Sequence, residues 1–389
     1  MSSASGHDAA TATAGRPTRA RRPAWERLPL LLLGFVALFL GVGAGLARLG
    51  VTMPEVAAGA AALHGPLMVS GFFGVVIAVE RAVAIGHAWA YAGPLLAGLG
   101  TLGLLFGAGT PGAWLYFGGS AVLLAASLDV LRRQRTGFML VITLAAACWC
   151  VGTALWALGL PVYRIVGWWL AFLVLTIAGE RLELSRFMPP SPTASRVFGL
   201  IVAVLLATLV LWSSPWAVQL AGVAMLALAA WLLRQDIARR TVRQQGLTRF
   251  VAVCLLAGYF WLALGGAVIA VAGLEPGSAA YDAALHALML GFVFSMVFGH
   301  APIIFPAVLR VAVPYHPVFY APLALLHFGL ALRVGGDASG IYPLTVWGGV
   351  LAALALLAFV LNTAAAVVRG LRSARRGDRG GAAGSTARR

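Results

Sequence analysis

The sequence predicts an all-α fold: a polytopic membrane helix bundle of about twelve transmembrane helices. Of the 389 residues, 61% are hydrophobic and 10% are charged, whereas a soluble domain carries about 25% charged residues. The mean hydropathy is +0.92. Apolar runs recur from Leu28 to Val368, and a run of roughly 20 residues can cross a hydrocarbon core of about 30 Å as a helix. Most of the chain is therefore expected to face lipid or other helices.

Proline, glycine and charged clusters divide residues 28–368 into successive spans of one membrane domain. We expect the spans at 28–48, 58–82, 88–108, 112–131, 137–158, 162–182, 195–213, 215–234, 249–273, 280–304, 316–335 and 342–368. The flanking segments 1–27 and 369–389 are rich in arginine and small residues. We expect both to be disordered basic tails.

The arginines give the expected orientation of these spans. All 28 basic residues are arginine, and with the N-terminus inside only Arg48, Arg164 and Arg333 fall on the outer side, which leaves 28 − 3 = 25 on the inner side. The positive-inside rule then places both termini in the cytoplasm. A chain rich in Arg, Ala, Gly and Leu is typical of GC-rich bacterial genomes, so we expect a bacterial inner membrane. The net charge of +16 is thus a topology signal, and the expected partner is the lipid bilayer, with no nucleic acid.

Histidines are the informative polar residues, because an ionisable residue within a membrane is costly. His64 and His286 each lie about six residues from the outer end of their spans, roughly 9 Å below the surface. Two imidazoles at one depth on two helices can bind one haem iron from both faces. His327 lies close to the same layer. His300 follows His286 by 14 residues and lies about 21 Å deeper, which excludes it from that site.

The expected cofactor is therefore haem b, held by His64 and His286. No CxxCH motif for covalent haem attachment is present. Haem propionates need cationic partners, and the outer arginines Arg48, Arg164 and Arg333 are candidates for that role. The alternative for each arginine is snorkelling to the membrane surface. His327 and His300 are candidate ligands for a second metal, either copper or a second haem.

Two short motifs around these histidines carry a resemblance. The segment His64-Gly-Pro-Leu-Met-Val-Ser-Gly71 resembles the second-helix haem-ligand motif of haem-copper oxidase subunit I and an early histidine-rich helix of the NnrS family of membrane haem-copper proteins. The segment His286-Ala-Leu-Met-Leu-Gly291, followed by Met296 and His300, resembles a late helix of the NnrS family. The resemblance implies a haem-binding helix bundle of about this length, with histidine ligands at these positions.

The chain also departs from these families. Pro66 stands where the NnrS helix typically has a second histidine. In the oxidases the copper ligands are histidines on the sixth and seventh helices, whereas the sixth and seventh spans of this chain contain no histidine. An oxidase-type copper centre is therefore not expected.

Four acids are expected to be buried at the predicted inner side: Glu80, Asp129, Glu180 and Glu183. Arginines lie beside them in the sequence, so the acids are expected to form ion pairs at the membrane surface or to belong to a proton path.

Three functions fit the sequence. The first is a b-type haem membrane protein that handles nitric oxide or nitrosative stress or transfers electrons, with a small diatomic ligand or an electron donor as partner and with haem-dependent redox activity. The second is a twelve-helix secondary transporter of a small solute, which has no need of two histidines at matched depth. The third is an assembly factor for a respiratory enzyme, which would tolerate loss of every membrane histidine.

Overall fold

A computed structural model describes residues 27–185 and 190–386, with side chains to residue 372. The described residues form helices and no strand. The long helices are α1 (Leu28–Arg48), α4 (Gly74–Ile85), α5 (Ala92–Leu105), α6 (Gly109–Arg133), α7 (Gly137–Ala157), α8 (Val162–Leu184), α9 (Pro192–Val210), α10 (Pro215–Gln235), α12 (Gly246–Ala272), α14 (Ser295–Leu309), α15 (Tyr320–Ser339) and α16 (Tyr342–Thr386). The short ones are α2 (Glu55–Gly59), η2 (Ala61–Leu63), α3 (His64–Pro66), η3 (Leu67–Phe73), η4 (Ala88–Tyr91), α11 (Ala238–Thr241), α13 (Ala279–His286), η5 (Ala287–Phe294) and η6 (Pro317–Phe319).

Several of these helices follow one another without a break and form one continuous helical span. Within the described residues, twelve helices or continuous helical spans are long and apolar enough to cross a membrane. They follow the twelve spans expected from the sequence, with ends that differ by a few residues. The all-α bundle is confirmed, and the chain has the make-up of an integral membrane protein. Residues 1–26 of the first predicted tail lie outside the described residues, and α16 continues through the second predicted tail to Thr386. The disorder of both tails stays a prediction.

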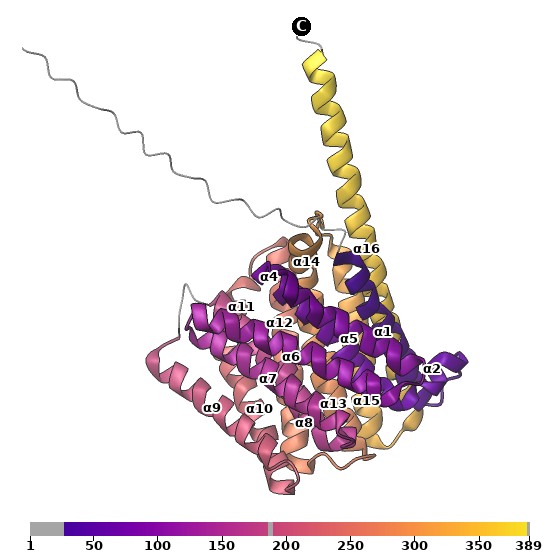
Figure 1. Ribbon diagram of the computed structural model, residues 1–389, viewed down its shortest axis with the longest axis vertical. Helices are drawn as coiled ribbons and strands as arrows, with labels where there is room; N and C mark the ends of the chain where they lie inside the picture. The colour runs from indigo at the N-terminus through magenta and orange to yellow at the C-terminus, as the bar shows by residue number, and fades with distance from the viewer. Residues whose placement is uncertain (1–26, 186–189, 387–389) are drawn as a thin grey trace, which may run out of the picture.

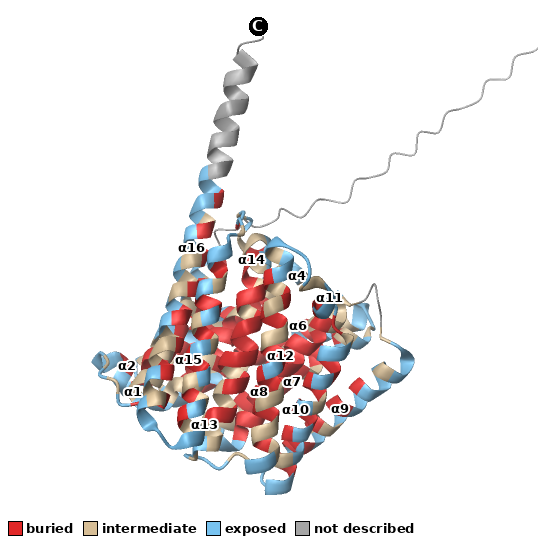
Figure 2. Cartoon of the chain, turned by 180° about the vertical axis from the view of Figure 1, so that it is seen from behind, coloured by how far each residue is buried: buried red, intermediate tan, exposed pale blue. Residues whose placement is uncertain are grey.

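The bundle is organised around α8. In its most apolar stretch 78% of the residues are buried, against 28% in α9. Figure 1 places α1 and α2 next to α16, on the side of the bundle away from α9. Figure 2 shows buried residues concentrated on the inward faces of the central helices, including α8 and α12. The outward faces carry exposed large apolar residues, among them Phe260, Val271 and Phe328, as expected for contact with lipid.

Two spans contain a π-helical segment in the half nearer the predicted outer surface. One rod is formed by η2, α3, η3 and α4 in succession, and the other by α13, η5 and α14. The π segments are η3 and η5, and each begins just after a membrane histidine. Pro66 precedes η3 and has no backbone N–H to donate, which favours a break in the α-helical pattern there; η5 contains no proline. π-helical turns occur frequently at functional sites because they re-aim side chains.

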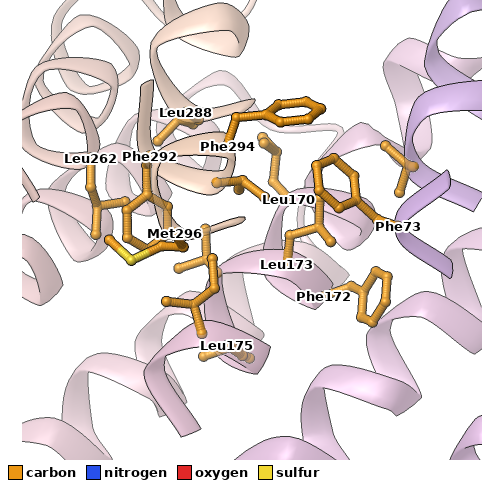
Figure 3. Close-up of a cluster of buried hydrophobic side chains, with 14 of the residues drawn as sticks. Phe73, Leu170, Phe172, Leu173, Leu175, Leu262, Leu288, Phe292, Phe294 and Met296 are labelled. Atoms are coloured by element: carbon orange, nitrogen blue, oxygen red, sulfur yellow. The ribbon is translucent and has the colours of Figure 1, made fainter. Parts of the chain in front are cut away.

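The two π segments pack against each other at the centre of the core. The Phe72 and Phe294 ring centres are 5.8 Å apart with planes 6° from parallel, and Phe73 lies 5.1 Å from Phe294. Leu170 and Leu173 of α8 lie beside Phe73 and Phe294 in Figure 3. The middle of the bundle is therefore filled with apolar side chains, and His64 and His286 lie on its predicted outer side.

Candidate haem site

His64 and His286 lie together at the predicted outer end of the bundle. Their ring centres are 6.3 Å apart and their planes are 17° from parallel. The equal count of six residues from each outer end was wrong, because the spans begin at Ala61 and at Ala279. The rings still meet, because His64 and His286 lie level with each other although their helices begin at different distances before them.

The two histidine helices run parallel and in register below this pair. Phe72 follows His64 by eight residues and Phe294 follows His286 by eight, and these phenylalanines are also ring partners. Equal spacing between two successive ring contacts holds the helices at a fixed separation. The positions of the two imidazoles are therefore set by the packed core beneath them.

Each imidazole uses Nδ1 for a hydrogen bond to a backbone carbonyl. His64 Nδ1 lies 2.7 Å from Gly41 O, and His286 Nδ1 lies 2.8 Å from Asp282 O. A carbonyl oxygen only accepts, so Nδ1 carries the proton and Nε2 of the neutral ring keeps its lone pair. The described residues give neither Nε2 a hydrogen-bond partner. This is the tautomer and the hydrogen-bonding pattern of histidines that bind metals.

Helix α1 forms a cradle for the His64 ring. Gly41 supplies the carbonyl, and a Cβ added at Gly45 would lie 2.8 Å from Cε1 of His64. Any side chain at position 45 would therefore move the ring. Glycine four residues after Gly41 places both positions on one face of α1, so this face is shaped to hold an imidazole.

On the other helix, a charged pair lies against His286. Asp282 accepts two hydrogen bonds from Arg333, at 2.7 Å from Nε and 2.9 Å from Nη2. Its Oδ1 is also 3.3 Å from Nδ1 of His286. Asp337 of α15 binds Thr345 at 2.9 Å, while its Oδ2 is buried without a partner. The polar chain His286–Asp282–Arg333 fixes the ring orientation and increases the electron density on it.

The three outer arginines take different positions. Arg333 is 7% exposed and Arg48 is exposed, and both guanidinium charges lie close enough to His64 to act on it electrostatically. Arg164 is exposed near the start of α8, and Val162 of that first turn lies near Gly65. The structure thus brings Arg48 and Arg333 to the histidine pair, while it places Arg164 at the surface of the same end.

His327 and His300 do not join the pair. Trp261 Nε1 donates to His327 Nδ1 at 2.9 Å, so the lone pair of Nδ1 is used and the ring proton sits on Nε2, which is buried without a partner. That arrangement does not favour metal binding by His327. His300 Nδ1 bonds Met296 O at 2.7 Å, and its buried Nε2 has no partner. No group of three or more His, Cys, Asp or Glu side chains suited to a metal occurs among the described residues.

The four acids at the predicted inner side differ in how they pair within the described residues. Arg181 binds Asp236 instead, at 2.6 Å and 3.1 Å. Asp129 pairs with Arg133 at 2.8 Å. Within the described chain no salt bridge engages the three glutamates, Glu80, Glu180 and Glu183, and their charges act on one another. An interfacial ion pair is therefore present at Asp129, as predicted. Helix rotation turns Arg181 away from the glutamates and toward the end of α10.

Sequence reasoning missed the residues that hold the two rings. Gly41, Gly45 and Asp282 touch the histidines, yet none was a candidate. Asp282 precedes His286 by four residues, a spacing that places both on one helix face and that could have indicated the pair. The Gly41 contact depends on how α1 is rotated against α3, which no local pattern shows.

Comparison with known families places the chain in one of them. A family model described as "Domain of unknown function (DUF8744)" matches residues 27–368. The chain belongs to this family. The match covers every predicted span and both histidine helices, so the site lies within the DUF8744 region. A search of curated proteins found no match.

Proposed function

We propose that this protein is an integral membrane protein that binds one b-type haem through His64 and His286. The spacing of the two rings carries the proposal. A metal–nitrogen bond is about 2.0 Å long and an imidazole nitrogen lies about 1.1 Å from its ring centre, so two opposed ligands of one metal have ring centres about 6.2 Å apart. The observed separation is 6.3 Å.

The surrounding residues fit that cofactor. His64 and His286, which each donate Nδ1–H to a carbonyl, would hold the iron through Nε2. A donor set of two suits a macrocycle that brings its own four nitrogens, whereas a structural zinc site needs four protein ligands. Arg48 and Arg333 lie at the same end and would supply cationic partners for two propionates. Met68 packs near Gly41 on the same face of α1, which adds an apolar contact beside the His64 ring.

A haem held by two histidines supplies one-electron transfer. If His64 and His286 both held the iron, a diatomic ligand would have to displace one of them. The packing of His64 against Gly45 and the Asp282 contact to His286 both resist such displacement. We therefore favour electron transfer, with nitric oxide binding as the second role. The composition favours a bacterial inner membrane, and the arginine distribution favours both termini in the cytoplasm, which would put the haem near the outer surface.

The test is a dithionite-reduced minus oxidised spectrum of the purified protein in detergent, together with pyridine haemochrome analysis. We expect a low-spin b-type spectrum in the wild type and its loss in His64→Ala and in His286→Ala. His316→Ala and His327→Ala are matched controls, because each removes an imidazole outside the pair, and we expect both to keep the spectrum. Size-exclusion chromatography checks that each variant remains folded.

A colourless protein from haem-replete cells contradicts the proposal, as does a spectrum that survives both substitutions. Addition of carbon monoxide to the reduced protein separates the two roles. An unchanged spectrum supports electron transfer, whereas a shifted one supports diatomic binding. The transporter reading is not favoured by the core, because the bundle centre is filled by Phe72, Phe294 and Leu170 rather than by a polar solute site.

A further inference from the structure

A hollow of about 460 Å³ opens where α12 and α15 begin, far from the histidine pair. Both helices start at the predicted inner surface, so the hollow lies at the level of lipid headgroups. Its walls are formed by Gln245, Gly246, Arg249, Val253, Tyr315, Pro317 and Tyr320. We propose that this hollow binds a phosphate group at the membrane surface, supplied by an anionic phospholipid headgroup or by free phosphate.

The charge of the hollow supports an anion. Arg249 is exposed and forms no salt bridge within the described chain. None of the seven lining residues is acidic. Arg239, Arg240 and Arg243, just before α12, are also exposed and raise the positive potential around the opening. Guanidinium groups bind phosphate oxygens through paired, charge-assisted hydrogen bonds.

The remaining donors are held in place before any ligand arrives. The ring of Phe250, which is fully buried, lies 6.0 Å from Tyr315 and 5.1 Å from Tyr320. Tyr315 also contacts Phe319, with ring centres 6.2 Å apart. These contacts fix the two tyrosine rings, so their hydroxyls need little further ordering to bind an oxygen ligand. The Gln245 amide adds a third neutral donor.

The apolar side of the hollow favours a lipid as the source of the phosphate. Val253 and Pro317 line it next to the polar donors, and this combination fits a headgroup whose acyl chains continue along α12. Basic pockets between membrane helices on the cytoplasmic side are known to hold anionic headgroups. Tyrosine is also enriched at this depth, because its ring is apolar and its hydroxyl is polar.

The experiment uses the full chain in neutral detergent and titrates it with phosphatidylglycerol, with phosphatidylcholine as the uncharged lipid. Native mass spectrometry counts the retained lipids, and the thermal unfolding midpoint reports binding. Arg249→Gln removes the only cation among the described lining residues, and Arg243→Gln makes the same charge change outside the hollow. We expect about tenfold weaker phosphatidylglycerol binding in Arg249→Gln and a much smaller loss in Arg243→Gln, which changes only the surrounding potential. Tyr320→Phe should weaken binding by a smaller factor.

A parallel titration with inorganic phosphate distinguishes the sources. A midpoint rise with phosphatidylglycerol alone assigns the site to a lipid headgroup, and a rise with phosphate that Arg249→Gln abolishes assigns it to free phosphate. The proposal is overturned if Arg249→Gln and Arg243→Gln bind phosphatidylglycerol and phosphate equally well, because the effect is then only the general charge of the inner surface. It is also overturned if neither ligand binds the wild type more tightly than phosphatidylcholine does.

Discussion

At the residue scale, the two histidines differ in what lies behind them. Both donate Nδ1–H to a backbone carbonyl, but only His286 also has a carboxylate oxygen nearby, Asp282 Oδ1, which lies 3.3 Å from its Nδ1. A carboxylate behind a ligand histidine makes the imidazole a stronger donor. The charge of Asp282 is balanced by Arg333, so this pair sets the local field at the proposed haem without adding net charge.

Replacing Asp282 with asparagine tests this difference. The substitution removes the negative charge of the carboxylate and leaves the positive charge of Arg333 unbalanced. Both effects disfavour the ferric state of the haem. We expect the midpoint potential to rise by about 60 mV, which is a tenfold shift in the ratio of ferric to ferrous protein. Spectroelectrochemical titration measures the potential, with Glu275→Gln at the same surface as the control. An unchanged potential in Asp282→Asn would show that the carboxylate does not act on the ligand.

At the element scale, the sequence predicted each span because a long apolar run suffices to indicate a membrane helix. It also predicted that the helices of His64 and His286 meet, since two histidines at a similar depth in two spans can bind one metal ion together. The π segments η3 and η5 were not predictable, because the α and π patterns differ by one residue per turn and hydrophobicity is high on all sides of both helices. The contact of Arg181 with Asp236 was missed for a related reason. In a helix that is apolar on all sides, the sequence has no periodic pattern that shows which face turns toward which neighbour.

The Arg181–Asp236 pair joins α8 to the end of α10, and Tyr259 of α12 donates to the same carboxylate at 2.7 Å. The exposed fractions of the two charged side chains are 6% and 2%. We expect Arg181→Ala to lower the free energy of unfolding by about 3–5 kcal/mol, because it leaves a buried carboxylate without its cation. Arg133→Ala breaks a pair in which Arg133 is 64% exposed and should cost less than about 1 kcal/mol.

Thermal unfolding in detergent measures both variants, and the haem spectrum is recorded in parallel. The haem spectrum of folded Arg181→Ala should match that of the wild type, since the Arg181–Asp236 pair lies at the opposite end of the bundle from His64. Equal midpoints for Arg181→Ala and Arg133→Ala would show that the buried pair does not hold the three helices together.

At the scale of the whole molecule, the proposed sites occupy opposite ends of one bundle, and the orientation decides which compartment each one faces. The histidine pair lies at the end with few arginines, and the phosphate hollow lies at the end with many. The apolar middle, where Phe73 and Phe294 meet, separates the two ends. With the orientation expected from the arginines, a haem at the histidine end would exchange electrons with a partner outside the cytoplasm.

Single cysteines in a variant that lacks the three native cysteines test this orientation. Glu275 and Gln244 are both exposed in loops at the two ends of α12, so Glu275→Cys and Gln244→Cys form a matched pair on one helix. A membrane-impermeant maleimide applied to intact spheroplasts should label Glu275→Cys. Gln244→Cys should react only after the membrane is permeabilised, because 25 of the 28 arginines are predicted to lie on its side and the positive-inside rule keeps that side in the cytoplasm. The reverse pattern would place the histidine pair at the cytoplasmic face and the electron donor inside the cell.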